Sequence, residues 1–248
     1  MALVLVTGAS TGLGLATALG LAGAGHDVVL HARNADRVKN QSVRKRMREV
    51  IYGDLADLDQ TAGLAAQANG IGHFDAVIHN AGVLKGPDVF AVNIVAPYVL
   101  TALMTPPSRS IVLSSSMHMS GTTDLDSANF SSPGDRGRAY EDSKLYVTAL
   151  AMALVDRRPD SLAHAVDPGW VPTRMGGPSA SDSLEEGHRT QEWLATAEEA
   201  EFSPRTGGYW YHRKSRQPHP AAGNTEFHHE LLDKLEAHTG IALAGTTP

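Results

Sequence analysis

The sequence predicts an α/β fold in which helices cover both faces of a doubly wound, mostly parallel sheet. Three observations indicate this fold class. Short apolar runs alternate with longer helix-compatible stretches, and a glycine-rich turn follows the first run. The length of 248 residues suits one large α/β domain or two small ones, and no linker divides the chain. We therefore expect one domain over residues 1–248.

The expected elements alternate along the first two thirds of the chain. Apolar, β-rich runs predict strands at 2–6, 27–31, 50–52, 74–79, 110–113 and 162–166. Helix-compatible stretches between them cover 13–24, 57–68, 89–104 and 140–156. A strand, a helix and the next strand form a crossover unit, so this order predicts a parallel sheet.

The tract after Gly169 has a different composition. Residues 171–224 are rich in Pro, Gly, Ser and charged residues, with one helix candidate at 183–197. A late strand is expected at 207–211 and a closing helix at 227–238. We interpret the tract as a mobile insertion of the same domain that faces the substrate.

Composition and charge exclude several classes of protein. Hydrophobic residues make up 42% and charged residues 19%, which is too apolar for a disordered chain. The net charge of −6 gives no basic excess for nucleic acid, and no apolar run is long enough to insert into a membrane. With no cysteine there is no disulfide and no thiolate chemistry. The N-terminus lacks a basic leader, so we expect a cytoplasmic protein.

Several further patterns have a plain structural explanation. The 12 histidines suggest a metal, but Asp233 stands where the HExxH motif needs its second histidine, so we expect no metal site. The basic run at 44–48 is interpreted as a solvated face. The aromatic side chains Trp193, Tyr209 and Trp210 could either line a pocket or pack in the core.

The glycine-rich turn Thr7–Gly14, TGASTGLG, directly follows the first strand and opens a helix. Unpaired N–H groups and the dipole at a helix N-terminus favour an anion there. Gly8 permits the turn, Gly12 allows close approach, and Gly14 allows close packing of the helix. The strand–turn–helix context predicts a nucleotide-binding site.

The end of the second strand indicates which nucleotide binds. An acidic residue at this position would bind the ribose 2′-hydroxyl of NAD, whereas an arginine would accommodate a 2′-phosphate. The sequence here continues as Arg33-Asn34 without a carboxylate. This pattern favours NADP, although Arg33 could also be an ordinary solvated side chain.

Tyr140 and Lys144 lie four residues apart on one face of a predicted helix. An adjacent ammonium should stabilise the tyrosinate and lower its pKa, which would suit Tyr140 to acid/base catalysis. Upstream, Ser114-Ser115-Ser116 follows a predicted strand at the edge where parallel sheets bind ligands. A serine there could hold a carbonyl oxygen.

Together these motifs resemble the short-chain dehydrogenases/reductases, in particular the retinol-dehydrogenase-like and bacterial anthracycline-type ketoreductase branch. Asp54-Leu55, His79-Asn80-Ala81-Gly82, Pro168-Gly169-Trp170-Val171 and Gly207–His212 fall in the order of that family. The resemblance implies a Rossmann-type domain. It also implies the following cofactor contacts: Gly8, Ser10, Thr11, Gly12, Leu13, Gly14, Arg33, Asn34, Asp54, Leu55, Asn80, Ala81, Gly82, Tyr140, Lys144, Pro168, Gly169, Val171 and Thr173.

The same resemblance implies a catalytic tetrad of Asn93, Ser115, Tyr140 and Lys144. Aligning the Ser-Ser-x-x-His pattern of the branch up to His118 makes Ser115 the active serine, with Ser116 as the alternative. Ser115 would bind the carbonyl oxygen and Tyr140 would protonate it. Lys144 would tune Tyr140 and bind the nicotinamide ribose, while Asn93 would position a water that connects Lys144 to solvent.

The resemblance also sets expectations for the regions around the tetrad. The segment between Gly82 and Asn93 is shorter than in most of the branch, which could open the substrate cleft. Residues 173–206 correspond to the substrate-covering insertion of the family, so we expect a lid there, with an ordinary surface excursion as the alternative.

The predicted function is an NADP(H)-dependent reductase acting on a carbonyl or alcohol group of a small hydrophobic molecule. One alternative is an NADP-binding sensor or partner subunit, a class that usually lacks one tetrad residue. A sugar-nucleotide epimerase or dehydratase is a weaker alternative, because those enzymes are longer and have a different glycine spacing. The family relation also leads us to expect a homodimer or a homotetramer.

Overall fold

One sheet of eight strands runs through the computed structural model, which describes residues 1–131 and 137–244. The strand order is β3-β2-β1-β4-β5-β6-β7-β8. All neighbouring pairs are parallel except β7 and β8. The strands are β1 Leu3–Val6, β2 Asp27–Ala32, β3 Glu49–Tyr52, β4 Ala76–His79, β5 Arg109–Leu113, β6 Leu162–Asp167, β7 Gly208–Tyr211 and β8 Lys214–Arg216.

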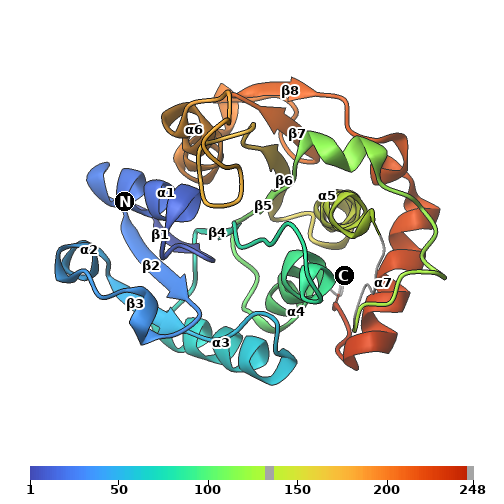
Figure 1. The fold of residues 1–248 in the computed structure, drawn as a ribbon, viewed down its shortest axis with the longest axis horizontal. Coiled ribbons are helices and arrows are strands. Elements are labelled where there is room, and N and C mark those ends of the chain that lie inside the picture. The colour runs from blue at the N-terminus through green and yellow to red at the C-terminus, as the bar shows by residue number, and fades with distance from the viewer. Residues whose placement is uncertain (132–136, 245–248) are drawn as a thin grey trace.

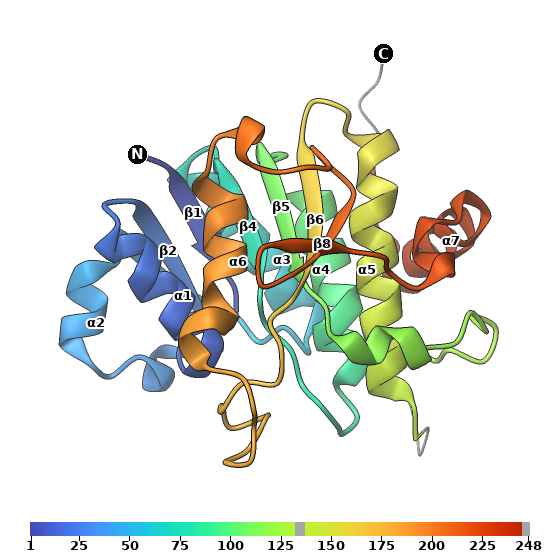
Figure 2. The same cartoon turned by 90° about the horizontal axis from the view of Figure 1, so that it is seen from above.

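Helices form a layer on each side of this sheet (Figures 1 and 2). One layer holds α1 and α6, and the other holds α3, α4 and α5, with α7 packed outside α5. The helices are α1 Gly12–Gly23, α2 Gln41–Arg46, α3 Leu58–Ile71, α4 Ala96–Leu103, α5 Ala139–Arg157, α6 Leu184–Thr196 and α7 Thr225–Thr239. Across residues 1–131 and 137–244, no helix has the length and apolar character needed to cross a membrane.

The apolar strands divide their side chains between the two layers. In β1, Val4 packs in the cluster under α1 and α6, whereas its neighbour Leu5 packs in the cluster under α3 and α4. Both side chains are completely buried. A strand covered on both faces must be apolar at consecutive positions, which explains the continuous apolar runs in the sequence.

The predicted α/β fold is confirmed, and every predicted strand and helix is present to within a few residues. The expected helix at 89–104 is divided into a π-helical turn, Ala91–Val95, and the regular helix α4. Apart from the short 3-10 turns, one helix and one strand of the described residues were not predicted. The first, α2, has six residues and a polar surface, and the second, β8, consists of three exposed polar residues without an alternating pattern.

Candidate active site

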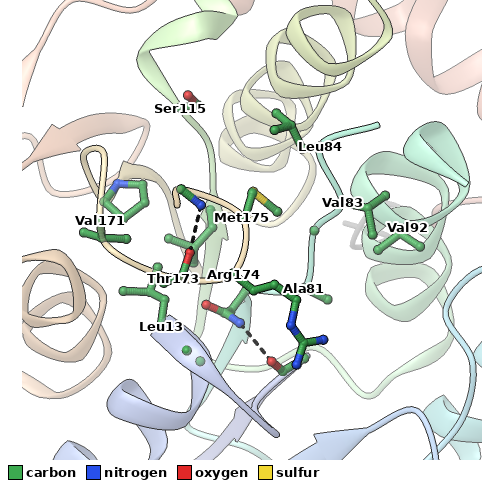
Figure 3. Close-up of a pocket in the computed structure, with 18 of the residues that line it drawn as sticks. Leu13, Ala81, Val83, Leu84, Val92, Ser115, Val171, Thr173, Arg174 and Met175 are labelled. Atoms are coloured by element: carbon green, nitrogen blue, oxygen red, sulfur yellow. Dashed lines mark hydrogen bonds between the residues drawn. The ribbon is translucent and has the colours of Figure 1, made fainter. Parts of the chain in front are cut away.

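A cleft of about 800 Å³ opens at the carboxyl ends of the strands. It lies where the strand order changes direction between β1 and β4, the position at which doubly wound sheets bind ligands. The loops after β1, β4, β5 and β6 and the start of α5 line it (Figure 3). Every cofactor and catalytic residue predicted from the sequence lines this cleft except Asn34 and Asn93.

The glycine-rich turn forms the floor of the cleft at the N-terminus of α1. Gly8 and Gly12 have φ angles of +62° and +57°, which L side chains rarely adopt. A Cβ at Gly8 would lie 2.8 Å from the Cα of Ala81, so the turn packs directly on the loop after β4. Thr11 provides no side-chain cap and the first turn of α1 contains no acidic residue, which leaves this helix end open to an anion.

His31 holds the glycine turn in place, and the sequence analysis missed this role. Its Nδ1 accepts a hydrogen bond from the Gly8 N–H at 3.0 Å, so its Nε2–H donates to the Gly53 carbonyl at 2.9 Å. Burial lowers the pKa of His31, which keeps the imidazole neutral. A polar residue within an otherwise apolar strand was the only sequence signal for this role.

Asn80 links the loop after β4 to the same turn. Its Nδ2 donates to the Thr7 carbonyl at 2.8 Å. The Oδ1 atom is buried beside the cleft and has no hydrogen-bond partner in the structure. A buried acceptor of this kind costs free energy unless a donor reaches it, so it favours a ligand with a hydroxyl or amide group.

Two arginines lie at the end of the cleft next to β2. Arg33 and Asp54 form an ion pair at 3.5 Å between Nε and Oδ2, and both side chains are partly exposed. Arg37, which was not predicted as a site residue, lines the same end. The predicted Asn34 is exposed outside the cleft, because its backbone instead starts the short 3-10 turn that carries Arg37.

Tyr140 projects from the first turn of α5, and its hydroxyl lies 4.0 Å from the Met175 sulfur. Burial raises the pKa of Tyr140 to about 12; the neighbouring Ser115 hydroxyl opposes this effect, and the charges of Asp167 and Glu141 add to it. The sequence analysis expected a lowered pKa for Tyr140, but in this geometry desolvation dominates and the net pKa is raised. A tyrosine with a raised pKa keeps its proton at neutral pH.

Lys144 lies one helical turn below Tyr140, with Nζ 5.5 Å from the centre of the tyrosine ring. Its ammonium donates to the Leu113 carbonyl at 2.7 Å, and only 4% of the residue is exposed. Burial lowers the pKa of Lys144 to about 8, and the charge of Asp167 opposes this shift. The predicted pair is therefore adjacent to the cleft, on one face of α5.

Ser115 is the one residue of the serine triplet whose hydroxyl lies close enough to Tyr140 to influence its pKa. The Ser114 hydroxyl is bound to Thr148 at 2.7 Å inside the protein. Ser116 begins the next 3-10 turn and is exposed. This arrangement agrees with the alignment of the Ser-Ser-x-x-His pattern.

Asn93 lies in the π-helical turn behind the cleft. Its amide accepts from the Val83 N–H at 2.8 Å and donates to the Val83 carbonyl at 3.0 Å and to the Ser143 hydroxyl at 2.9 Å. It therefore fixes the short loop after Gly82, whose residues Val83 and Leu84 line the cleft. Irregular π-helical turns are frequent at functional sites.

The late aromatic residues pack in the core and do not line the cleft. Trp193, Phe202 and Trp210 form edge-to-face pairs, with ring centroids 5.3–6.2 Å apart. Tyr209 is buried and its hydroxyl donates to Asp167 at 3.2 Å. The exposed apolar residues at the mouth of the cleft are Leu84, Met117, Trp170 and Met175, of which the sequence analysis had named only Trp170.

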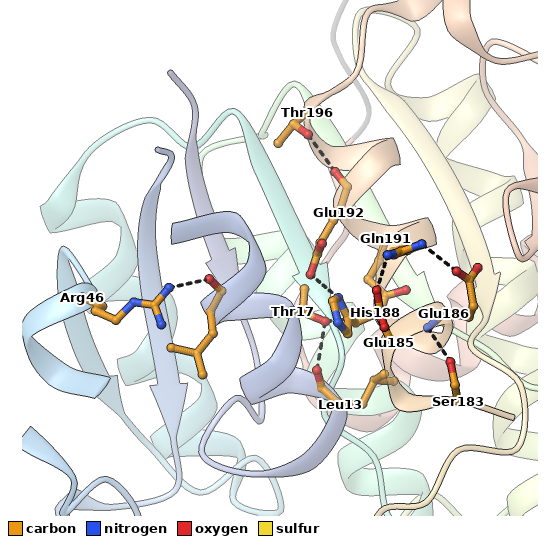
Figure 4. A network of polar contacts seen from close by, with 12 residues as sticks. Leu13, Thr17, Arg46, Ser183, Glu185, Glu186, His188, Gln191, Glu192 and Thr196 are labelled. Atoms are coloured by element: carbon orange, nitrogen blue, oxygen red, sulfur yellow. Dashed lines mark hydrogen bonds and ion pairs between the residues drawn. The ribbon is translucent and has the colours of Figure 1, made fainter. Parts of the chain in front are cut away.

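Within the predicted lid at 173–206, only residues 173–176 line the cleft. The helix α6 packs against α1, where Gln191 donates to Thr17 at 3.2 Å (Figure 4). Leu194 of the same helix is completely buried. Thr173 contacts the glycine turn, since a Cβ at Gly12 would lie 3.4 Å from its methyl group. The predicted lid therefore meets the cleft only through the loop before α6.

Comparison with known proteins identifies related chains. The sequence model described as short chain dehydrogenase matches residues 2–183. The short-chain dehydrogenase chry4 of Gibberella zeae is 36% identical, over 98% of this chain and 99% of its own. Retinol dehydrogenase 13 of Mus musculus is 28% identical, over 99% of this chain and 86% of its own.

Solved structures share the fold at lower identity. An uncharacterized protein of Mycobacterium paratuberculosis aligns with a TM-score of 0.78 and 22% identity, over 98% of this chain and 95% of that chain. A blue fluorescent protein from a metagenomic library, solved in complex with NADPH, aligns with a TM-score of 0.68 and 22% identity, over 85% and 95%. At this identity the likeness concerns the fold.

Proposed function

The chain belongs to the short-chain dehydrogenase family of oxidoreductases, and we propose that it is an NADP(H)-dependent reductase of a carbonyl group on a small hydrophobic molecule. The single observation that carries the proposal is the convergence of Ser115, Tyr140 and Lys144 in one cleft with the glycine turn. The apolar mouth of that cleft supports a hydrophobic substrate.

The cleft fits a dinucleotide along its length. The uncapped N-terminus of α1 suits a diphosphate, and the unpaired Oδ1 of Asn80 suits a ribose hydroxyl or an amide. Arg33 and Arg37 form a cationic end that suits a 2′-phosphate. Two further predicted contacts, Val171 and Thr173, line the same cleft, and Thr173 lies against the glycine turn.

When bound, the nicotinamide supplies a hydride to the carbonyl carbon, which converts the carbonyl to an alcohol once its oxygen takes up a proton. Ser115 holds the carbonyl oxygen through its hydroxyl, and Tyr140 donates the proton from its own hydroxyl. Because burial keeps Tyr140 protonated at neutral pH, the proton needed for reduction is in place.

Lys144 provides the positive charge next to Tyr140. As the tyrosine gives up its proton it becomes an anion, and the ammonium one helical turn away stabilises that anion. Asn93 acts at a greater distance by fixing Val83 and Ser143 around this centre. We also propose that Asn93 positions a water that connects Lys144 to solvent.

Substitution of the tyrosine tests this function. Tyr140→Phe keeps the ring and removes the proton, so kcat should fall by about 100- to 10,000-fold, the range contributed by general acid catalysis. The Kd for NADPH should remain close to that of the wild type. The readout is NADPH oxidation against a panel of hydrophobic ketones and aldehydes.

Substitution of the serines locates the carbonyl-binding hydroxyl. Ser115→Ala should reduce kcat severely. Ser116→Ala should have a mild effect on kcat, because the Ser116 side chain is exposed. The opposite order would move the site to Ser116. Retention of most of the turnover in Tyr140→Phe would contradict the mechanism as a whole.

A further inference from the structure

A completely buried histidine, His118, lies behind Ser115 and is not used by the mechanism above. It is part of the short 3-10 helix Ser116–Ser120 that follows β5. Its ring packs on Tyr209 with the ring centroids 4.5 Å apart. A buried imidazole must satisfy both ring nitrogens, and the partners of these nitrogens define what it does.

The hydrogen bonds of His118 determine its tautomer. The backbone N–H of His219 can only donate, and it lies 3.0 Å from Nε2, so Nε2 is the acceptor. The proton is therefore on Nδ1, which donates to the Ser115 carbonyl at 2.7 Å. Burial lowers the pKa of His118, in keeping with this neutral form.

Two distant parts of the chain thus meet at His118. The acceptor side is fixed by His219, whose own side chain caps the 3-10 turn Pro220–Gly223 by accepting from the Ala221 N–H at 3.1 Å. The donor side holds the backbone of the serine that faces Tyr140. Ser115 itself is at the N-cap of the 3-10 helix, and its carbonyl also accepts from the His118 backbone N–H at 3.0 Å, so the imidazole adds a second bond to the same oxygen.

We propose that His118 is a positioning residue that holds Ser115 in its productive orientation by connecting the Ser115 carbonyl to the His219 backbone. This inference rests on the proposed function, because it assigns His118 an effect only through the carbonyl-binding serine. Displacement of a reacting group by about 1 Å can reduce rate by about 100-fold, so a support of this kind affects turnover without touching the substrate.

The experiment compares variants that keep different hydrogen bonds. His118→Asn places an amide N–H near the position of Nδ1 and can still donate to Ser115, whereas His118→Phe keeps the ring volume and loses both bonds. We expect His118→Phe to lower kcat by about 10- to 100-fold with the Kd for NADPH unchanged. His118→Asn should recover most of that loss.

A double variant separates positioning from general damage. If His118 acts through Ser115, then His118→Phe should cost nothing further in kcat when Ser115 is already Ala. His228→Phe is the matched control. It removes a buried histidine whose Nε2 lies 2.6 Å from the Ala222 carbonyl and which is not the partner of the Ser115 carbonyl, so its kcat should match the wild type.

Each outcome has a defined meaning. Equal losses from His118→Phe in the wild-type and Ser115→Ala backgrounds, or a comparable loss in His228→Phe, would overturn the positioning role. So would a His118→Phe variant that folds, as judged by its circular dichroism, with full activity. Full activity of Ser115→Ala alone would instead overturn the proposed function, which makes the two failures distinguishable.

Discussion

Lys144 shows how a single residue can favour function at the expense of stability. Its ordinary pKa of 10.5 falls to about 8 in the native protein because the ammonium is buried. Between these two pH values the unfolded chain binds more protons than the native one, so native stability is lost as the pH falls through that window. The difference corresponds to about 3 kcal/mol.

We therefore predict that the neutral variant Lys144→Met gains stability relative to the wild type at pH 7, and that this relative gain shrinks by about 3 kcal/mol as the pH rises to 10.5. The Leu113 carbonyl loses its donor in the variant, which adds a constant cost that does not depend on pH. Urea unfolding of both proteins from pH 7 to 10.5 measures the difference. A difference that stays flat with pH would contradict the buried charge.

Arg33 provides a prediction on the choice of cofactor. Arg33→Ala should weaken NADPH binding by about 10- to 100-fold, because a charge-assisted contact contributes about 1.5–3 kcal/mol, and should leave the NADH affinity almost unchanged. The variant also leaves Asp54 without its ion-pair partner, which adds repulsion toward the 2′-phosphate. Fluorescence titration with both cofactors gives the two Kd values.

Arg48→Ala is the matched control, since Arg48 pairs with Asp27 at 2.8 Å and does not line the cleft. Its Kd for NADPH should equal that of the wild type. Parallel losses for NADPH and NADH in Arg33→Ala would show a general disturbance of the site and exclude Arg33 as the basis of NADP preference.

Among the elements, the loop before α6 is the part of the predicted lid that lines the cleft. Arg174 is exposed in this loop, and Arg189 lies in α6, where Glu185 and Glu186 bind it. Trypsin should cleave the ligand-free protein after Arg174 and not after Arg189. NADPH together with a ketone substrate should slow the cleavage more than NADPH alone, because closure over ligand excludes water and protease.

Mass spectrometry of the fragments at timed intervals measures the rates of cleavage after Arg174 and after Arg189. The variant Arg174→Gln removes the first cleavage site and so confirms its position. Cleavage first at Arg189 would mean that α6 opens and that the lid extends over this helix as well. Cleavage at Arg174 that no ligand slows would leave the loop as an ordinary surface excursion.

The predictability of these elements from sequence follows their burial. The strands were predictable because both faces of the sheet are covered, so their residues form apolar runs such as Val4–Val6. The order of the motifs predicted that Ser115 and Tyr140 share one cleft, and both residues line it. The packing of α6 was not predictable, because its polar surface hides the few residues that anchor it, such as Gln191 and Leu194.

The pKa of Tyr140 also could not be predicted from the spacing of residues. The sequence shows that Lys144 is one turn away, but it does not show how deeply both groups are buried, and burial dominates the pKa values of both. Met175 and Arg37 were missed for a related reason. They lie in exposed loops, where no periodic pattern marks the residues that face a ligand.

At the scale of the whole molecule, early and late parts of the chain share one core. The late helix α6 packs on α1, and the late strand β7 extends the sheet next to β6. The closing helix α7 packs on α5, where the Tyr146 and Phe227 rings lie 6.0 Å apart, and the Tyr98 hydroxyl donates to Ile241 at 2.7 Å. Neither half of the chain could bury its apolar surface alone.

We therefore predict that residues 1–248 unfold in one cooperative transition that NADPH shifts as a whole. The tryptophans lie at positions 170, 193 and 210, so their fluorescence reports on the late part of the chain, whereas far-ultraviolet circular dichroism reports on all of it. Saturation at 100 times the Kd adds about 2.7 kcal/mol, which corresponds to about 5–10 °C in Tm for a domain of this size.

Both signals should give the same Tm, and NADPH should raise that Tm by the same amount in each, although the glycine turn that we propose as its binding site belongs to the first residues of the chain. Tyr140→Phe is a suitable control, because it should lose activity and keep the full shift. Two separate transitions, or a shift seen by circular dichroism but not by tryptophan fluorescence, would mean that the late tract folds as an independent unit and that the cleft is not built by one domain.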